Sequence, residues 1–105
     1  MPMNRGEVWW VERPEGKRRP FLILTRDRAL AVVNEVIAVP ATRGPRGLAI
    51  EVPLGPEDGM PAECVLSLDN LDLVARVYFR ERITRLNPDR MRQACRALAL
   101  ATGCA

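Results

Sequence analysis

The hydrophobic pattern of this chain changes its period once, close to residue 87, and this change restricts the fold more than any other feature. Before it, short apolar or β-branched runs recur at intervals of roughly ten residues, as they do in small barrels and sandwiches. After it, apolar residues recur at helical spacing. We therefore predict a mainly β fold with one C-terminal α-helix (α+β), formed as a single domain by residues 1–105.

The expected strands lie within about residues 6–86. Residues 6–12 combine β-branched and aromatic side chains, which favour a strand. Residues 20–25 are almost wholly apolar, as in a strand that is buried on both faces. Residues 48–53 alternate, with Leu48 on the apolar face, which predicts a strand with one buried face. Three further strands are expected at residues 35–40, around Cys64, Leu66 and Leu68, and at residues 80–86.

The expected helix covers about residues 88–102. Asn87 is a favourable N-cap, Pro88 suits the first helical position, and Gly103 is a favourable stop. A single apolar stripe follows at positions i, i+3, i+4 and i+7. It consists of Met91, Ala94, Cys95 and Leu98. Residues 27–33 could form a further short helical turn.

The composition excludes several classes of function. The chain has no histidine, so it lacks the commonest metal ligand and the commonest general base. Cys64, Cys95 and Cys104 show no Cys-x-x-Cys spacing, which favours free thiols over a disulfide framework or a zinc site. No apolar run approaches the ~20 residues of a membrane span. The start of the chain has no apolar signal core, so we expect a cytoplasmic protein.

Charge is distributed unevenly along the chain. Residues 1–47 have a balance of +4, residues 48–74 of −6, and residues 75–105 of +5. Basic ends around an acidic middle are compatible with a face that binds a polyanion. An ordinary solvated surface explains the same pattern.

The first polar segment consists of Lys17, Arg18 and Arg19, directly before Pro20 and an apolar strand. An arginine anchored at the end of a strand offers a rigid fork to a phosphate group. Pro20 favours an extended conformation for Arg19. The alternative is a loop with solvated charges.

The second polar segment places Thr42, Arg43 and Arg46 after the expected strand 35–40. A hydroxyl beside guanidinium groups suits a phosphate or a ribose hydroxyl. The alternative is a simple turn with exposed basic residues.

The third polar segment ends in Asp69 and Asn70, after an expected strand. Both residue types commonly stabilise turns. The functional alternative is base recognition, because an amide can read an exposed base edge.

Trp9 and Trp10 are adjacent on a strand and therefore point to opposite faces. One is expected in the core and the other in a dimer contact or a base stack.

Taken in this order, these segments resemble the MazF/PemK toxin family. Residues 5–12 are similar to the first strand of that family. Arg19 and Pro20 before an apolar strand resemble its Arg-Pro, residues 39–42 its Val-Pro-x-Thr, and Asp69–Asn70 its acidic-then-amide pair. The resemblance extends from about residue 5 to residue 102.

This resemblance implies a small SH3-like β-barrel of the MazF/CcdB type and a homodimer. It also implies metal-independent, sequence-specific cleavage of single-stranded RNA without a cofactor, in which the 2′-hydroxyl attacks the adjacent phosphodiester. The catalytic residues would be Arg19 and Thr42. The expected partner is a MazE-like antitoxin with a disordered acidic tail. The expected RNA-binding residues are Lys17, Arg18, Arg43, Arg46, Asp69 and Asn70.

One departure from the family is a short first hairpin loop at residues 13–18, where many relatives have a longer one. The cleavage sequence therefore cannot be transferred, and it stays open whether a carboxylate such as Glu15 reaches the scissile phosphate. Two alternative functions also stay open. One is a non-enzymatic toxin of the same fold, like the CcdB gyrase poison, which would need neither Arg19 nor Thr42. The other is a plain nucleic-acid-binding barrel.

Overall fold

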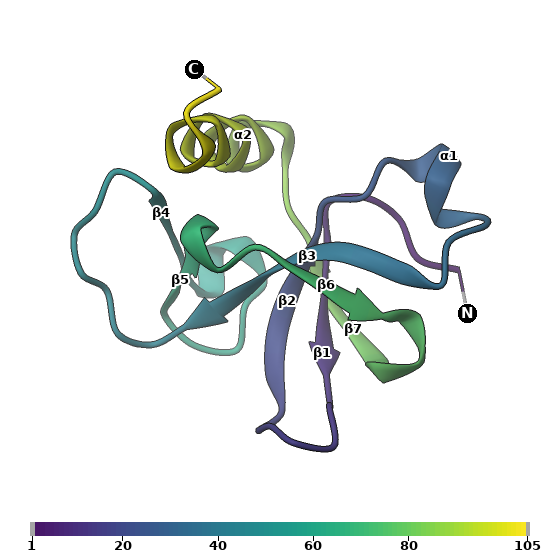
Figure 1. Ribbon diagram of the computed structural model, residues 1–105. Coiled ribbons are helices and arrows are strands. Elements are labelled where there is room, and N and C mark those ends of the chain that lie inside the picture. The colour runs from purple at the N-terminus through teal and green to yellow at the C-terminus, as the bar shows by residue number, and fades with distance from the viewer. Residues whose placement is uncertain (1, 105) are drawn as a thin grey trace.

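The computed structural model describes residues 2–104 and is mainly β, with one long helix at the C-terminal end (Figure 1). This confirms the predicted fold class. The strands are β1 (Glu7–Val11), β2 (Arg19–Ile23), β3 (Glu35–Thr42), β4 (Glu51–Leu54), β5 (Cys64–Ser67), β6 (Asp72–Ala75) and β7 (Phe79–Arg85). The helices are α1 (Asp27–Leu30), α2 (Pro88–Thr102) and the 3₁₀ turns η1 (Pro56–Asp58), η2 (Leu68–Asn70) and η3 (Arg76–Tyr78). None of the helices within residues 2–104 is long and apolar enough to cross a membrane.

All strand pairs are antiparallel, and β3 lies at the centre of the sheet. The strand order is β4-β5-β3-β2-β1-β7, and β6 also pairs with β3. Thus β2 lies along one edge of β3, whereas β5 and β6 follow each other along the opposite edge. The turn η2 connects β5 to β6 and therefore lies beside the middle of β3. Among the strands of residues 2–104, β4 and β7 are the ends of the path, so the sheet is a curved, barrel-like sheet that does not close.

The sheet is buried on both faces, because successive side chains of its central strands enter two different cores. Val8, Leu22 and Val39 belong to the core beneath α2. Their sequence neighbours Trp9 and Phe21 belong to the second core, on the side of α1. This confirms the doubly buried strand expected at residues 20–25, and it places Trp9 in the interior with 3% of its surface exposed.

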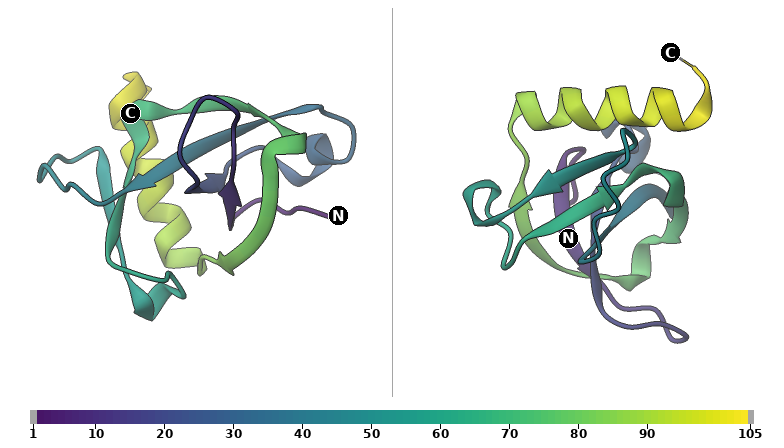
Figure 2. Two further views of the ribbon diagram at one scale, coloured as in Figure 1. Left: turned by 90° about the horizontal axis from the view of Figure 1, so that it is seen from below. Right: turned by 90° about the vertical axis from the view of Figure 1, so that its left-hand side faces the viewer.

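Helix α2 begins and ends where its sequence signals predict. The side chain of Asn87 accepts a hydrogen bond from the backbone N–H of Arg90, and Gly103 adopts the left-handed conformation with φ 74°. The helix lies across the sheet above β4 and η2, away from the β1–β2 hairpin (Figure 2). Arg90 Nε also donates to the buried Asp58 Oδ1 at 2.9 Å, which ties the first turn of the helix to η1.

Three local predictions were wrong. The strand expected at residues 48–53 begins only at Glu51, and Leu48 is 44% exposed instead of lying on a buried face. Glu51 accepts hydrogen bonds from the backbone N–H groups of Arg46 and Leu48, so the preceding residues form a loop around its carboxylate. Strand β3 extends to Thr42, so this residue belongs to the sheet and not to the following turn. Strand β6 was not predicted at all.

Candidate active site

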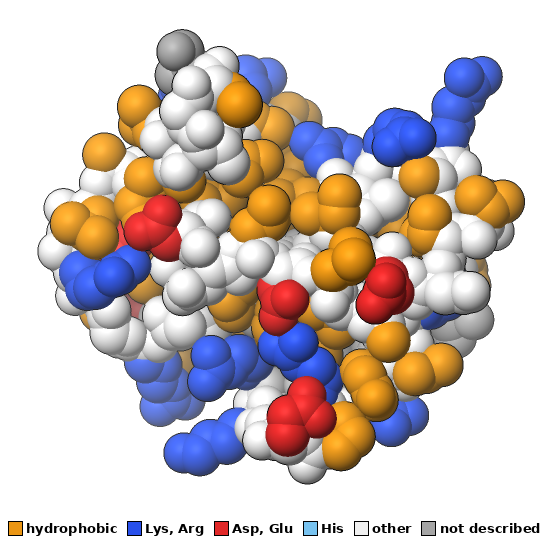
Figure 3. Space-filling view, in the orientation of Figure 1, with side chains coloured by type: hydrophobic (Ala, Val, Ile, Leu, Met, Phe, Trp, Pro, Cys, Tyr) orange, Lys and Arg blue, Asp and Glu red, His pale blue; other side chains and the backbone are white. Residues whose placement is uncertain are grey.

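A pocket of about 270 Å³ opens beside the β1–β2 hairpin, and its lining includes the first residues of β2, the last residues of β3 and the first residue of β5. We call it pocket 1. Lys and Arg side chains gather around the lower part of this face of the molecule (Figure 3). The pocket is lined by Trp10, Lys17, Arg18, Arg19, Pro20, Ala41, Thr42, Arg43, Met60, Pro61, Ala62, Glu63 and Cys64.

Arg19 and Thr42 both line pocket 1. The register of β2 and β3 pairs Phe21 with Pro40, and continuing it by two residues sets Arg19 opposite Thr42. Side chains at opposite positions of an antiparallel pair point to the same face and lie close together. Neither residue belongs to the buried interior: Arg19 is exposed, and Thr42 is partly exposed. The pocket therefore presents a guanidinium group and a hydroxyl group to the same space.

Arg18 is held on the wall of pocket 1 by two interactions. Its guanidinium carbon lies 4.5 Å from the centre of the Trp10 ring, and its Nη2 lies 2.9 Å from Glu81 Oε1 of β7. Trp10 is thus the outward-facing member of the tryptophan pair, as the alternation of a strand requires. In contrast, Arg19 makes no ion pair with any residue between 2 and 104. The two adjacent arginines therefore differ. The Arg18 guanidinium contacts Trp10 and Glu81, whereas the Arg19 guanidinium is available to an anion.

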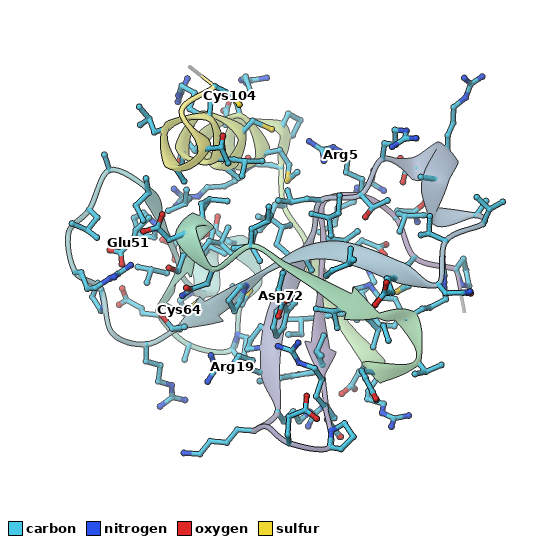
Figure 4. All side chains as sticks on the ribbon, viewed as in Figure 1. Arg5, Arg19, Glu51, Cys64, Asp72 and Cys104 are labelled. Carbon is cyan, nitrogen blue, oxygen red and sulfur yellow. The ribbon has the colours of Figure 1, made fainter. Side chains whose placement is uncertain are left out.

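A second pocket of about 310 Å³ lies beside the first, and we call it pocket 2. Among residues 2–104, only Lys17 and Arg19 line both pockets. In Figure 4, Arg19 lies below both Cys64, which lines pocket 1, and Asp72, which lines pocket 2. The lining of pocket 2 consists of Val11, Arg13, Gly16, Lys17, Arg19, Phe21, Pro40, Asn70 and Asp72.

Pocket 2 contains an ordered ion pair. Arg13 Nη1 donates to Asp72 Oδ2 at 2.9 Å, and the Arg13 guanidinium lies 5.3 Å from the centre of the Phe21 ring. The other oxygen of Asp72 accepts the backbone N–H of Leu73 at 2.7 Å. These contacts fix both side chains at the start of β6. Sequence reasoning did not identify Arg13 or Asp72, because the strand that carries Asp72 was not predicted.

Two of the predicted RNA-binding residues lie outside both pockets. Arg46 donates through its backbone N–H and through Nε to Glu51, at 2.9 and 3.1 Å, and so stabilises the loop before β4. Asp69 lies in η2 and is exposed. The neighbouring Asn70 does line pocket 2, and its amide donates to Ser67 Oγ at 3.2 Å. The pockets therefore bring together Lys17, Arg18, Arg43 and Asn70 of the predicted set.

Two further groups of pocket 1 have their own chemistry. Burial and the nearby Asp58 carboxylate raise the pKa of the Cys64 thiol, and Arg43 only partly offsets them. Pocket 1 also contains a carboxylate, that of Glu63. Glu15, whose position the sequence left open, lines neither pocket. All three cysteines are free thiols. Within residues 2–104 no three His, Cys, Asp or Glu side chains are grouped as a metal ion would require.

Comparison with known proteins identifies the family. The sequence profile of the PemK-like, MazF-like toxins of type II toxin-antitoxin systems matches residues 4–102. The chain belongs to this family. The MazF/PemK resemblance inferred from the sequence is thereby confirmed.

Several relatives of this MazF-like chain have been named. It is 44% identical over 103 residues to a protein of Mycobacterium tuberculosis named probable endoribonuclease MazF2, with 97% of this chain and 100% of the relative covered. It is 41% identical over 101 residues to the probable endoribonuclease MazF5 of the same organism, with 95% and 93% covered.

Two solved structures share this architecture. The Mycobacterium tuberculosis toxin MazF-mt6 superposes with a TM-score of 0.85 at 28% identity, over 92% of this chain and 96% of that one. An endoribonuclease from a mycobacterial species, solved in complex with its cognate antitoxin, gives a TM-score of 0.88 at 24% identity, over 98% and 97%. The second likeness establishes the fold alone.

Proposed function

We propose that this MazF-like protein is the toxin of a type II toxin-antitoxin system and acts as a metal-independent, sequence-specific endoribonuclease on single-stranded RNA. Two similar proteins of Mycobacterium tuberculosis are named probable endoribonucleases, which supports this activity. The observation that carries the proposal is that Arg19 and Thr42 line one open pocket, where a cation without an ion-pair partner among residues 2–104 meets a hydroxyl group.

In the proposed reaction, the scissile phosphate binds at the meeting point of the two pockets. The 2′-oxygen of the preceding ribose forms a bond to phosphorus, and the bond from phosphorus to the 5′-oxygen breaks. The products are a 2′,3′-cyclic phosphate and a 5′-hydroxyl end. The Arg19 guanidinium stabilises the charge that develops on the phosphorane oxygens, and Thr42 orients the phosphate or the 2′-hydroxyl.

Proton transfer needs a group other than histidine, since the chain has none. Glu63 lines pocket 1 together with Arg19 and Thr42. We assign it the role of accepting the proton of the 2′-hydroxyl, which is a common use of an ionised carboxylate. The departing 5′-oxygen takes its proton from water, so the pocket has to stay open to solvent on that side.

The proposed assembly is a cytoplasmic homodimer controlled by an antitoxin. One similar structure is a complex of an endoribonuclease with its cognate antitoxin, and others are MazE–MazF complexes from Deinococcus radiodurans. The cations around pocket 1 fit an inhibitor that carries a disordered acidic segment, because such a segment occupies a basic groove and competes with RNA.

The test is incubation of the purified protein with total RNA in the presence of a chelator, followed by mapping of 5′-hydroxyl ends. We expect cleavage at a defined short sequence, and we expect it to be lost in the Arg19→Ala and Thr42→Ala variants. Intact RNA together with gyrase trapped on DNA would instead favour the CcdB-like alternative. Binding of RNA that weakens with salt but produces no scission would favour the plain binding barrel.

A further inference from the structure

We propose that pocket 2 binds the base of the nucleotide on the 3′ side of the cleaved bond and selects it by hydrogen bonds that Arg13 donates, Asp72 accepts and the Asn70 amide both donates and accepts. This inference rests on the proposed ribonuclease function. It goes further, because it gives the bound RNA a direction and names the residues that determine specificity at one position.

The direction follows from the residues that the two pockets share. Arg19 lines both pockets, so a phosphate bound to its guanidinium has one nucleoside on each side. Thr42 lines pocket 1 and not pocket 2. The ribose that supplies the attacking 2′-hydroxyl precedes the scissile phosphate, and it has to lie beside the assigned base Glu63, which also lines pocket 1 and not pocket 2. The nucleoside that follows the phosphate is therefore directed into pocket 2.

The polar groups of pocket 2 suit a base edge. Asn70 contributes an amide, which contains both a donor and an acceptor, and Asp72 contributes a carboxylate. The Arg13 pair and the Leu73 backbone N–H hold the carboxylate in one orientation, while each of its oxygens keeps a further lone pair. Fixed donors and acceptors of this kind discriminate between bases, because a mismatched base covers these groups without giving them partners.

The apolar groups of pocket 2 suit the flat body of the base. Phe21 and Pro40 are cross-strand partners on β2 and β3, and both line the pocket. Arg13 covers the Phe21 ring, so a base can stack on the guanidinium plane while its edge faces Asn70 and Asp72.

The part of pocket 1 away from pocket 2 is more apolar than pocket 2. Its wall includes Trp10, Met60, Pro61 and Ala62, which offer apolar surface and few directional groups. Stacking against such a surface tolerates all four bases, since every base has a π-face. We therefore expect stronger selection on the 3′ side of the cut than on the 5′ side.

The experiment uses an RNA with a randomised central segment, so that no recognition sequence has to be known beforehand. Both ends of each cleavage product are sequenced, and the ratio of the most to the least favoured base is measured at every position around the cut. For the wild-type protein we expect a ratio of about tenfold or more directly 3′ of the cut. Asn70→Ala should reduce this ratio to about threefold or less, and Asp72→Asn should change which base is favoured.

The matched control is Asn34→Ala, which removes an exposed amide that lines neither pocket. It should keep the base ratios of the wild type at every position. Thermal unfolding of each variant shows whether it is folded, and Asn70 and Asp72 are both exposed, so little loss of stability is expected.

The outcomes separate this inference from the function on which it rests. A wild-type protein that cuts no RNA overturns the proposed function and the inference together. A wild-type protein that cuts RNA, with Asn70→Ala and Asp72→Asn variants that keep its ratio at the 3′ base, overturns the inference alone. Variants that change selection only at the base 5′ of the cut overturn the assigned direction.

Discussion

Arg19, the first residue of β2, and Thr42, the last residue of β3, line the same pocket from the ends of two paired antiparallel strands. Strand ends held by a sheet are rigid, so a phosphate at this place meets groups whose positions are already set. Such preorganised donors stabilise a transition state without reorganisation at the moment of reaction.

The first prediction concerns these two residues. Arg19→Ala should lower kcat on the order of a hundredfold to a thousandfold, because it removes a preorganised donor. Arg19→Lys should restore only part of this loss, since an ammonium group lacks the planar fork of a guanidinium. Thr42→Ser should retain more activity than Thr42→Ala, because it keeps the hydroxyl. Single-turnover cleavage of a defined RNA measures these effects.

Arg28→Ala is the matched control for the Arg19 variants, because it removes an exposed cation on α1 that lines neither pocket. It should leave kcat close to that of the wild type. Equal losses in Arg28→Ala and Arg19→Ala would show that general charge, and not the geometry of the pocket, determines the rate.

The second prediction concerns Glu63. The proton of the 2′-hydroxyl has to move to a base, so replacing the Glu63 carboxylate with an amide in Glu63→Gln should lower kcat by about a hundredfold or more. Glu15→Gln, which changes an exposed carboxylate outside both pockets, should keep the wild-type kcat. Equal kcat values in Glu63→Gln and the wild type would exclude Glu63 as the base.

The third prediction uses Cys64 as a chemical probe of pocket 1. In a Cys95→Ser/Cys104→Ser background, N-ethylmaleimide should react slowly with Cys64 at neutral pH, because burial and Asp58 raise the pKa of this half-buried thiol. The reaction should become faster as the pH rises. Once attached, the bulky group should fill the pocket and stop RNA cleavage.

The control for this experiment adds Cys64→Ser to the same background, and each protein is compared with its own untreated sample. Treatment should leave the activity of this triple variant unchanged. Full activity after complete modification of Cys64 would show that RNA does not enter pocket 1.

The predictability of the site from sequence differs between its two pockets. Arg19 directly precedes a clearly apolar strand, so its place at the start of β2 could be inferred. Thr42 was expected just beyond the strand 35–40 and lies at the end of β3, two residues from the predicted boundary. The place of Asp72 could not be inferred, because β6 has a weak strand signal: Leu73 is 52% exposed, and only Val74 of this strand is buried. A strand of four residues with one buried side chain gives no alternation that sequence reasoning can recognise.

Partners of charged residues were also beyond sequence reasoning. The sequence does not distinguish Arg18, Arg19 and Arg46. In the structure Arg18 forms an ion pair with Glu81, and Arg46 forms one with Glu51. The Glu81 contact joins residues 63 positions apart, which only the fold brings together. The open edge of the barrel-like sheet could not be inferred either, because closure depends on whether the two end strands meet, and local patterns do not encode this.

The last prediction concerns stability at acidic pH. Glu7 is a buried carboxylate that accepts hydrogen bonds from the Asn4 backbone N–H at 2.9 Å and from Trp9 Nε1 at 3.0 Å, and Arg82 Nε lies 3.1 Å away. Burial alone would raise the pKa of Glu7, but the hydrogen bonds from Asn4 and Trp9 and the charge of Arg82 together lower it below its ordinary value of 4.5.

A carboxylate whose pKa is lower in the folded state than in the unfolded chain stabilises the fold above its unfolded pKa. This stabilisation is lost as the pH falls through the lower, folded value. The free energy of unfolding of the wild type should therefore decrease below about pH 4.5. Glu7→Gln should lose about 1–3 kcal/mol at neutral pH and should depend less on pH in acid, because the amide cannot accept the same set of hydrogen bonds. Urea unfolding at a series of pH values measures both effects, with the exposed Glu35→Gln as control. If Glu7→Gln and Glu35→Gln gave the same pH dependence, the network around Glu7 would not be a source of acid sensitivity.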